Sequence, residues 1–168
     1  MPQFIEYSKE PIIKSDLEKL CEFSLKELRE FSIRNPSSKM AKIDPLAICL
    51  CQGAASYFIN KGKGVKDFDI YFFYQYFYTR KIKPVDLGDI FEKFGVREED
   101  WKRGFKGRRI DFCRRKIGRI EESVLIEKNL VNFLNESRTL TAKELTKKAI
   151  IGIWPEEIFG KVIWRGSQ

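Results

Sequence analysis

The chain has 168 residues, the length of one ordinary domain, with 43% hydrophobic residues and a formal net charge of +8. This apolar content is enough for a core without disulfide or metal staples and excludes a disordered chain. The positive charge favours an anionic partner such as a nucleotide, a nucleic acid or an acidic surface. Since the sequence contains no histidine, Ser-His and Cys-His dyads, a histidine base and the usual zinc sites are excluded.

The four cysteines show no C-x-x-C spacing, and three of them lie inside apolar runs. We therefore expect the three thiols inside apolar runs to be buried. All four cysteines, Cys21, Cys49, Cys51 and Cys113, are expected to be reduced. The N-terminal sequence has no basic and then apolar leader, and no apolar run approaches the ~20 residues of a membrane span. These features predict a cytoplasmic protein that does not associate with a membrane.

Residues 1 to 14 have no clear period and contain two prolines, which predicts an extended arm. From Ser15 apolar residues recur at helical spacing, and this helix is expected to end near Arg34 because Asn-Pro follows. Ser15 and Glu18 form a predicted capping box at its start.

LAICLC (46–51) is a short, continuous apolar run, which is typical of a buried strand. Gly53 turns the chain, and AASYFINKG then has the length of two helical turns. DFDIYFFYQYF (67–77) is rich in aromatic residues, and at least its first half is expected to be a second strand. Its aromatic side chains fit a sheet core better than a stacking platform for single-stranded nucleic acid.

Pro84 opens another helical pattern that is expected to end before Gly95. GRRIDFCRR (107–115) alternates, with Ile110 and Phe112 on one face and Asp111 on the other, so it predicts a third strand.

The C-terminal part predicts two helices, one over about 119–136 and one with a capping box of Thr141 and Glu144. The apolar tail KVIW is expected to pack on the sheet edge. Altogether the pattern predicts one α/β (α+β) domain over 1–168, with a mixed sheet of three to five strands flanked by helices. Its core spans about 44–116, its N-terminal helix 15–34, and its C-terminal helices and tail 119–168.

Asp67 and Asp69 stand in the otherwise apolar second strand. Side chains at i and i+2 of a strand share a face, with α-carbons ~7 Å apart, so the two carboxylates project together. Two carboxylates held this close repel each other unless a cation lies between them, and a divalent metal suits them. Asp111 on the third strand is placed to approach the same point, which suggests a magnesium site of three aspartates.

The Gly53 turn leads into a short helix whose free N–H groups and positive dipole end suit a phosphate. Lysines between this turn and the acids, and arginines around Asp111, supply positive charge for a triphosphate. These residues are Lys61, Lys63, Lys66, Arg108, Arg109, Arg114 and Arg115.

A glycine turn after a strand, then D-h-D on the next strand and a lone aspartate in an h-D-h setting on a third resembles the nucleotidyltransferase superfamily, to which DNA polymerase beta belongs. CQGAASYF, GVKDFDIYFF, GRRIDF and GKVIW resemble more closely an uncharacterised prokaryotic group of that superfamily. The resemblance covers about residues 44–116.

The resemblance implies a nucleotidyltransferase-like fold and a two-metal transfer of a nucleoside monophosphate from an NTP. Asp67 and Asp69 would ligate two Mg²⁺ (or Mn²⁺) ions, and Asp111 would complete the second and help deprotonate the acceptor hydroxyl. Gly53 and the following N–H groups would hold the phosphate tail, with Ala54, Ser56 and Lys66 beside them.

The chain departs from the superfamily pattern at the turn, where Ala54 and Ala55 follow the glycine and the first hydroxyl is at Ser56. Simpler interpretations also stand. The acid pair is consistent with solvent-facing strand residues, and Asp111 with an ion-pair partner of Arg109 or Arg114. The arginine cluster is consistent with a solvated basic edge, and the three tryptophans with core or interface anchors.

Three functions of different classes follow from these residues. The first is a metal-dependent nucleotidyltransferase acting on a hydroxyl of a small molecule, an RNA end or a protein. The second is a non-catalytic nucleotide- or nucleic-acid-binding module on the same fold. The third is a partner-binding protein whose acid pair engages lysines of the partner.

Overall fold

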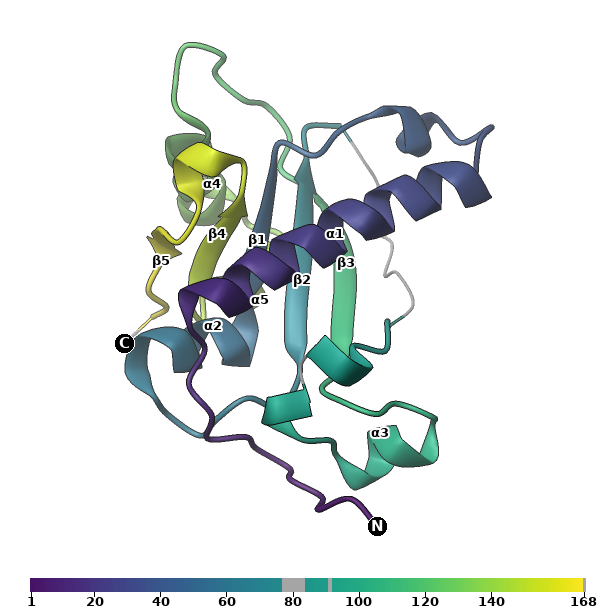
Figure 1. The fold of residues 1–168 in the computed structure, drawn as a ribbon. Coiled ribbons are helices and arrows are strands. Elements are labelled where there is room, and N and C mark those ends of the chain that lie inside the picture. Colours follow the sequence, from purple (N-terminus) through teal and green to yellow (C-terminus); the bar gives the residue numbers. More distant parts are fainter. Residues whose placement is uncertain (77–83, 91, 168) are drawn as a thin grey trace.

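The computed structural model describes residues 1–76, 84–90 and 92–167. A five-stranded sheet with the strand order β3-β2-β1-β4-β5 lies at its centre (Figure 1). Strands β2 and β3 are parallel, and all other neighbours are antiparallel. The strands are β1 (Ala47–Cys51), β2 (Phe68–Tyr74), β3 (Ile110–Lys116), β4 (Ile150–Trp154) and β5 (Val162–Trp164). The predicted α/β fold with a mixed sheet is confirmed.

Helices pack against this sheet. Helix α1 crosses one face diagonally, whereas α4 and α5 lie near β4 and β5 (Figure 1). The helices are α1 (Lys14–Arg34), α2 (Gln52–Asn60), α3 (Glu98–Lys102), α4 (Ile126–Glu136) and α5 (Leu140–Leu145). Short 3₁₀ turns span Lys39–Lys42, Gly88–Ile90, Glu92–Phe94 and Glu156–Ile158. Within the described parts of the chain, none of the helices combines the length and the apolar character that crossing a membrane requires.

The central strands are almost wholly apolar because both of their faces are buried, and Asp69 of β2 is an exception. Ile70 and Phe72 of β2 pack in one core with Leu17 and Leu20 of α1. Tyr71 and Phe73 point to the opposite face, into a second core that includes Leu130 of α4 and Leu145 of α5. The prediction that the aromatic run forms sheet core is thus confirmed for residues 71–74 and wrong for Tyr76, which is 68% exposed. Residues 77 and 78 lie outside the described chain.

The other predicted apolar segments also pack as expected. The tail forms β5 and pairs with β4, as the prediction of packing on the sheet edge requires. The four cysteines are free, and Cys49, Cys51 and Cys113 are buried. These are the three cysteines that lie in strands, where a small thiol packs as an apolar group.

The strand pairings bring three chain segments together at one edge of the sheet, where β1 ends and where β2 and β3 begin. Cys51 at the end of β1 pairs with Asp69 at the start of β2. Asp69 pairs in turn with Asp111 at the start of β3. The turn into α2 therefore lies beside the D-x-D motif, and that motif lies beside the third aspartate. This edge is the part of the fold that carries the candidate site.

A buried arginine holds the extended N-terminal arm against this edge. Arg108 is fully buried, and its guanidinium donates hydrogen bonds of 2.8–3.0 Å to four backbone carbonyls. These carbonyls belong to Ile5, Glu6, Lys66 and Phe94. Burial lowers the pKa of Arg108 to about 10, so the group stays charged at neutral pH. One side chain thus joins the arm, the residue before Asp67 and the loop at Phe94.

The helix predicted from Pro84 to Gly95 is wrong. The described residues of this stretch form two short 3₁₀ turns, Gly88–Ile90 and Glu92–Phe94, and residue 91 lies outside the description. Gly88 has φ +31°, which lies outside the right-handed helical region, and Val85 forms a bridge with Ile110 of β3 instead. The apolar spacing reflects packing on the sheet edge.

Several helix boundaries also differ from those predicted. Helix α4 begins at Ile126 rather than near 119, and Asn129 holds the preceding turn by donating to the carbonyls of Glu121 and Val124. Thr139 rather than Thr141 caps α5, accepting from the Ala142 N–H at 3.2 Å. At α1 the cap is the Asp16 carboxylate, which accepts from the Ile13 N–H at 2.8 Å, and not Ser15 with Glu18.

We predict that Arg108→Met lowers the free energy of unfolding by about 3 kcal/mol or more, because it leaves four buried carbonyls without their donor. Urea unfolding followed by circular dichroism measures this loss. Arg119→Met is the matched control, since Arg119 is exposed and its replacement should change the stability little. Equal midpoints for the two variants would contradict the anchoring role of Arg108.

Candidate functional site

A cleft of about 630 Å³ opens between α2 and the start of β2. Its lining includes five of the seven residues to which the superfamily resemblance assigns a role at the site. They are Gly53, Ser56, Lys66, Asp67 and Asp69. The volume lies within the ~300–1,000 Å³ that is usual for small-molecule sites.

Asp67 and Asp69 reach the cleft because of strand alternation. Phe68 between them is fully buried in the core that contains α1, so its two neighbours project to the opposite face. Both aspartates are partly exposed and line the cleft. The prediction that the two carboxylates share one face is confirmed.

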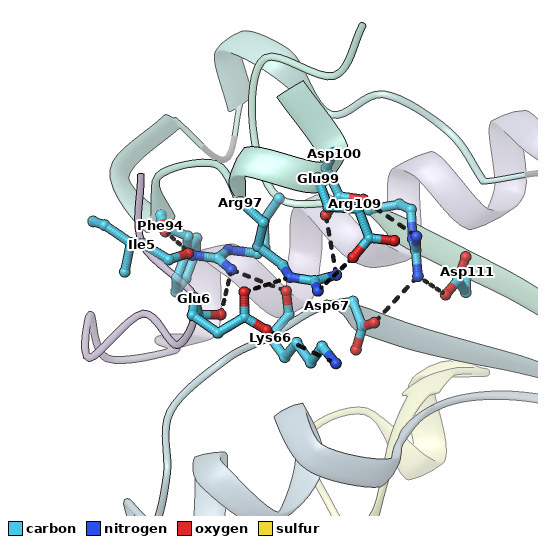
Figure 2. A network of polar contacts seen from close by, with 11 residues as sticks. Ile5, Glu6, Lys66, Asp67, Phe94, Arg97, Glu99, Asp100, Arg109 and Asp111 are labelled. Atoms are coloured by element: carbon cyan, nitrogen blue, oxygen red, sulfur yellow. Dashed lines mark hydrogen bonds and ion pairs between the residues drawn. The ribbon is translucent and has the colours of Figure 1, made fainter. Parts of the chain in front are cut away.

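Asp111 lies on the same face but behind the cleft lining. It pairs in register with Asp69, yet it is only 3% exposed and is not among the residues that line the cleft. Arg109 Nη2 donates to Asp111 Oδ2 at 2.9 Å and also lies 3.4 Å from Asp67 Oδ2 (Figure 2). The ion pair of Asp111 with Arg109, one of the two partners considered from the sequence, is therefore present. In this arrangement an acceptor hydroxyl in the cleft does not reach Asp111.

The Arg109 guanidinium belongs to a longer network of opposite charges. Its Nη1 atom lies 3.2 Å from Oδ1 of Asp100, a fully buried residue of α3. Asp100 Oδ2 is 3.5 Å from Arg97, which in turn donates to Glu6 of the N-terminal arm at 3.1 Å (Figure 2). This network links the arm, α3 and the aspartates, so the guanidinium of Arg109 is held in place from several sides.

The electrostatic environment of Asp67 favours its neutral form. Burial raises the pKa of this carboxyl, and the nearby charge of Asp111 raises it further. Arg109 and Lys66 act in the opposite direction but do not cancel these effects. An ionised Asp67 is therefore underpaired in the protein alone, and an added cation at the cleft would stabilise its charge.

The turn into α2 leaves open space beside the acid pair. A Cβ added at Gly53 would meet no atom within 4 Å, so packing does not require glycine there. Gln52, just before it, also lines the cleft and has φ +61°, a left-handed conformation that is uncommon for a residue with a side chain. Such backbone strain is concentrated at functional sites.

The other two residues expected at the turn have different surroundings. The Ala54 side chain is fully buried in the core, so only its backbone N–H remains as a phosphate donor. The Ser56 hydroxyl lines the cleft and accepts a hydrogen bond from the Ala149 N–H at 3.1 Å, which connects α2 to the start of β4.

The basic residues divide between the cleft and the interior. Lys63 and Lys66 line the cleft, together with Lys148. Arg108 is buried against carbonyls, and Arg114 is buried with its guanidinium 3.7 Å from the ring centre of Phe31. These two arginines are therefore neither a solvated basic edge nor ligands for a triphosphate in the cleft. Lysines provide the positive charge that a ligand would meet there.

The two carboxylates of the cleft suit one metal ion that is also bound by the phosphates of a substrate. Among the described residues, no group of three or more acidic or cysteine side chains is arranged to hold a metal ion. Asp67 and Asp69 nevertheless place two hard oxygen donors in one cleft. Mg²⁺ is usually bound by one or two carboxylates together with substrate phosphates, so two aspartates fit a metal–triphosphate complex.

The cleft lining also includes residues that were not predicted from the sequence. Tyr7 comes from the N-terminal arm and Lys148 from the segment before β4. Gln52 precedes the glycine turn, and nothing in its local sequence predicts a positive φ. Of these three residues, only Gln52 is adjacent in the sequence to a predicted site residue, Gly53.

We predict that Asp67→Asn raises the melting temperature at about pH 7.5 in the absence of divalent cations. A carboxyl with a raised pKa in the folded state contributes full stability below its ordinary pKa of about 3.9, and this stability is lost as the pH rises through the raised value. Asparagine keeps the neutral form, so the difference between variant and wild type should vanish below about pH 4.

Differential scanning calorimetry across this pH range measures the effect. Asp89→Asn is the control, because Asp89 is exposed outside the cleft. An Asp67→Asn variant that melts below the wild type at every pH would contradict the electrostatic assignment.

Comparison of the chain with protein-family models, with curated proteins and with solved structures finds no match.

Proposed function

We propose that the cleft binds a nucleoside triphosphate with Mg²⁺ (or Mn²⁺), and that the protein transfers the nucleoside monophosphate to a hydroxyl of a small molecule, an RNA end or a protein. The observation that carries the proposal is the meeting of the Gly53 turn with Asp67 and Asp69 in one open cleft. These segments are distant in the sequence, and the pairing of β1 with β2 brings them together.

The positive groups of the cleft support a triphosphate as the ligand. Lys63, Lys66 and Lys148 line the same cleft as the carboxylates and can neutralise phosphate oxygens. The first N–H groups of α2 lack partners within the helix, and the open space beside Gly53 allows a phosphate to approach them. The lysines and α2 would thus bind and orient the phosphate tail.

Asp67 and Asp69 would hold the metal ion. The ion supplies charge neutralisation for the phosphates and alignment for in-line displacement at phosphorus. In this proposal Arg109 fixes the Asp67 carboxylate from behind at 3.4 Å. Asp111 acts through Arg109, as a positioning residue, since it does not line the cleft.

The same cleft also supports a nucleotide-binding module without catalysis. The observation that favours this second function is the ion pair between Arg109 and Asp111 at 2.9 Å. It engages the aspartate that the superfamily resemblance assigns to the second metal and to proton removal. Nucleotide binding is then retained, whereas transfer is absent.

Transfer is tested by incubating the protein with the four α-³²P-labelled NTPs, Mg²⁺ or Mn²⁺, and separate pools of small molecules, RNA and protein from a cell extract. We predict labelling of one pool, and a loss of at least about 100-fold in the double variant Asp67→Asn, Asp69→Asn, since the metal ligands are gone. The matched control is Asp44→Asn with Asp89→Asn, two exposed aspartates outside the cleft.

Labelling that survives in the Asp67, Asp69 double variant would overturn the transferase assignment. Metal-dependent stabilisation by an NTP, measured by thermal shift, with no labelled product in any pool, supports the binding module. No stabilisation by any NTP with either metal contradicts both functions.

We predict that Gly53→Ala weakens nucleotide binding by about 10-fold or more while leaving the stability unchanged or raised by up to about 1 kcal/mol. Alanine favours a helix over glycine, but its methyl group fills the space beside the phosphate donors. Isothermal titration calorimetry and urea unfolding measure the two effects. Ser15→Ala is the control, because it also favours a helix but lies at an exposed position of α1 outside the cleft. Unchanged nucleotide affinity in Gly53→Ala would contradict the proposed phosphate site.

A further inference from the structure

Arg109 lies where three carboxylates meet. Its two terminal nitrogens lie within 3.4 Å of oxygens from Asp67, Asp100 and Asp111. Figure 2 shows the guanidinium between Asp100 on one side and Asp67 and Asp111 on the other. A single guanidinium thus serves acids from three different segments of the chain. The five N–H donors of a guanidinium allow one arginine to neutralise several carboxylates at once.

The guanidinium of Arg109 occupies the position that a cation shared by Asp67 and Asp111 would take. Asp67 precedes β2, and Asp111 lies on β3, its parallel neighbour. A metal shared by these two aspartates would have to lie between their carboxylates, where Arg109 Nη2 already contacts both. The guanidinium and such an ion are mutually exclusive.

The remainder of the network opposes movement of Arg109. Asp100 is fully buried and its carboxylate is shared between Arg97 and Arg109. Withdrawing Arg109 would remove the partner of the buried Asp111 carboxylate and leave Asp100 with Arg97 alone, which is strongly unfavourable. Arg109 is therefore expected to stay in place when a ligand enters the cleft.

The open side of the acid cluster has room for a cation. Asp67 and Asp69 line the cleft, whereas Asp111 is 3% exposed and does not. Arg109 contacts the Asp67 carboxylate from the side of Asp111, whereas Asp67 and Asp69 face the cleft. A cation bound in the cleft therefore does not have to displace the guanidinium.

We propose that Arg109 takes the place of a second metal ion, so that this site binds one divalent cation, on Asp67 and Asp69, rather than two. The inference rests on the proposed function, because it assumes that the cleft binds a metal. It assigns Arg109 a positioning role toward the carboxylates. It also explains how the cluster of acids is balanced on its buried side by a group of the protein itself.

The test counts Mn²⁺ ions. Wild-type protein and variants are titrated with Mn²⁺ alone and then with Mn²⁺ and inorganic triphosphate, and bound Mn²⁺ is measured by equilibrium dialysis and electron paramagnetic resonance. We expect one Mn²⁺ per wild-type chain with the spectrum of an isolated ion. Arg109→Gln removes the guanidinium and should bind two ions with the spectrum of a spin-coupled pair.

Four further variants separate charge, shape and folding. Arg109→Lys keeps a positive charge and should bind one ion, and Arg103→Gln removes an exposed positive charge and should also bind one. Asp111→Asn should still bind one ion and lose less affinity than Asp69→Asn, which should lose at least about 10-fold because it removes a direct ligand. This last comparison does not depend on whether Arg109→Gln folds.

Each outcome decides one question. Two Mn²⁺ ions in the wild type, equal counts in the wild type and Arg109→Gln, or a loss of Mn²⁺ in Asp111→Asn as large as in Asp69→Asn would overturn the inference and leave the proposed function standing. No Mn²⁺ bound by the wild type, with or without triphosphate, would overturn the proposed function as well.

Discussion

Arg108 and Arg109 are consecutive residues, and the extended backbone before β3 leads their guanidinium groups into different surroundings. Arg108 donates to four backbone carbonyls and thereby joins the N-terminal arm to the start of β2. Arg109 contacts three carboxylates from three segments. Buried guanidinium groups are unfavourable unless their donors are satisfied, so both arrangements constrain the surrounding chain strongly. The position of Asp67 at the cleft depends on these two side chains.

Two features of the cleft are energetically unfavourable in the protein without a bound ligand. Asp67 is ionised at neutral pH only against the effect of burial and the charge of Asp111. Gln52 adopts a left-handed backbone conformation beside it. Both features are unfavourable in the free protein, and both lie where a phosphate and a cation would be bound. This coincidence is the general sign of a binding site whose ligand relieves the strain and the charge.

The sequence predicted the strands that are buried on both faces, because a continuous apolar run between turn residues has few other interpretations. It did not predict β4 (Ile150–Trp154), a strand that contains Gly152. The fold requires that glycine, since a Cβ at 152 would clash with the backbone of Ile158. The helix predicted over 84–94 is also wrong. Apolar spacing there serves contacts with the sheet edge, and local pattern alone does not distinguish this from a helical face.

At the site, the sequence by itself determined that Asp67 and Asp69 share one face, because the two-residue period of a strand follows from local backbone geometry. It also placed a glycine turn at the end of the preceding strand. Only the tertiary structure decided that β2 and β3 pair in parallel with Asp69 beside Asp111, and that Arg109 rather than Arg114 engages that aspartate. Strand register and the choice of ion-pair partner depend on contacts between segments far apart in the chain, and these contacts form only when the whole fold closes.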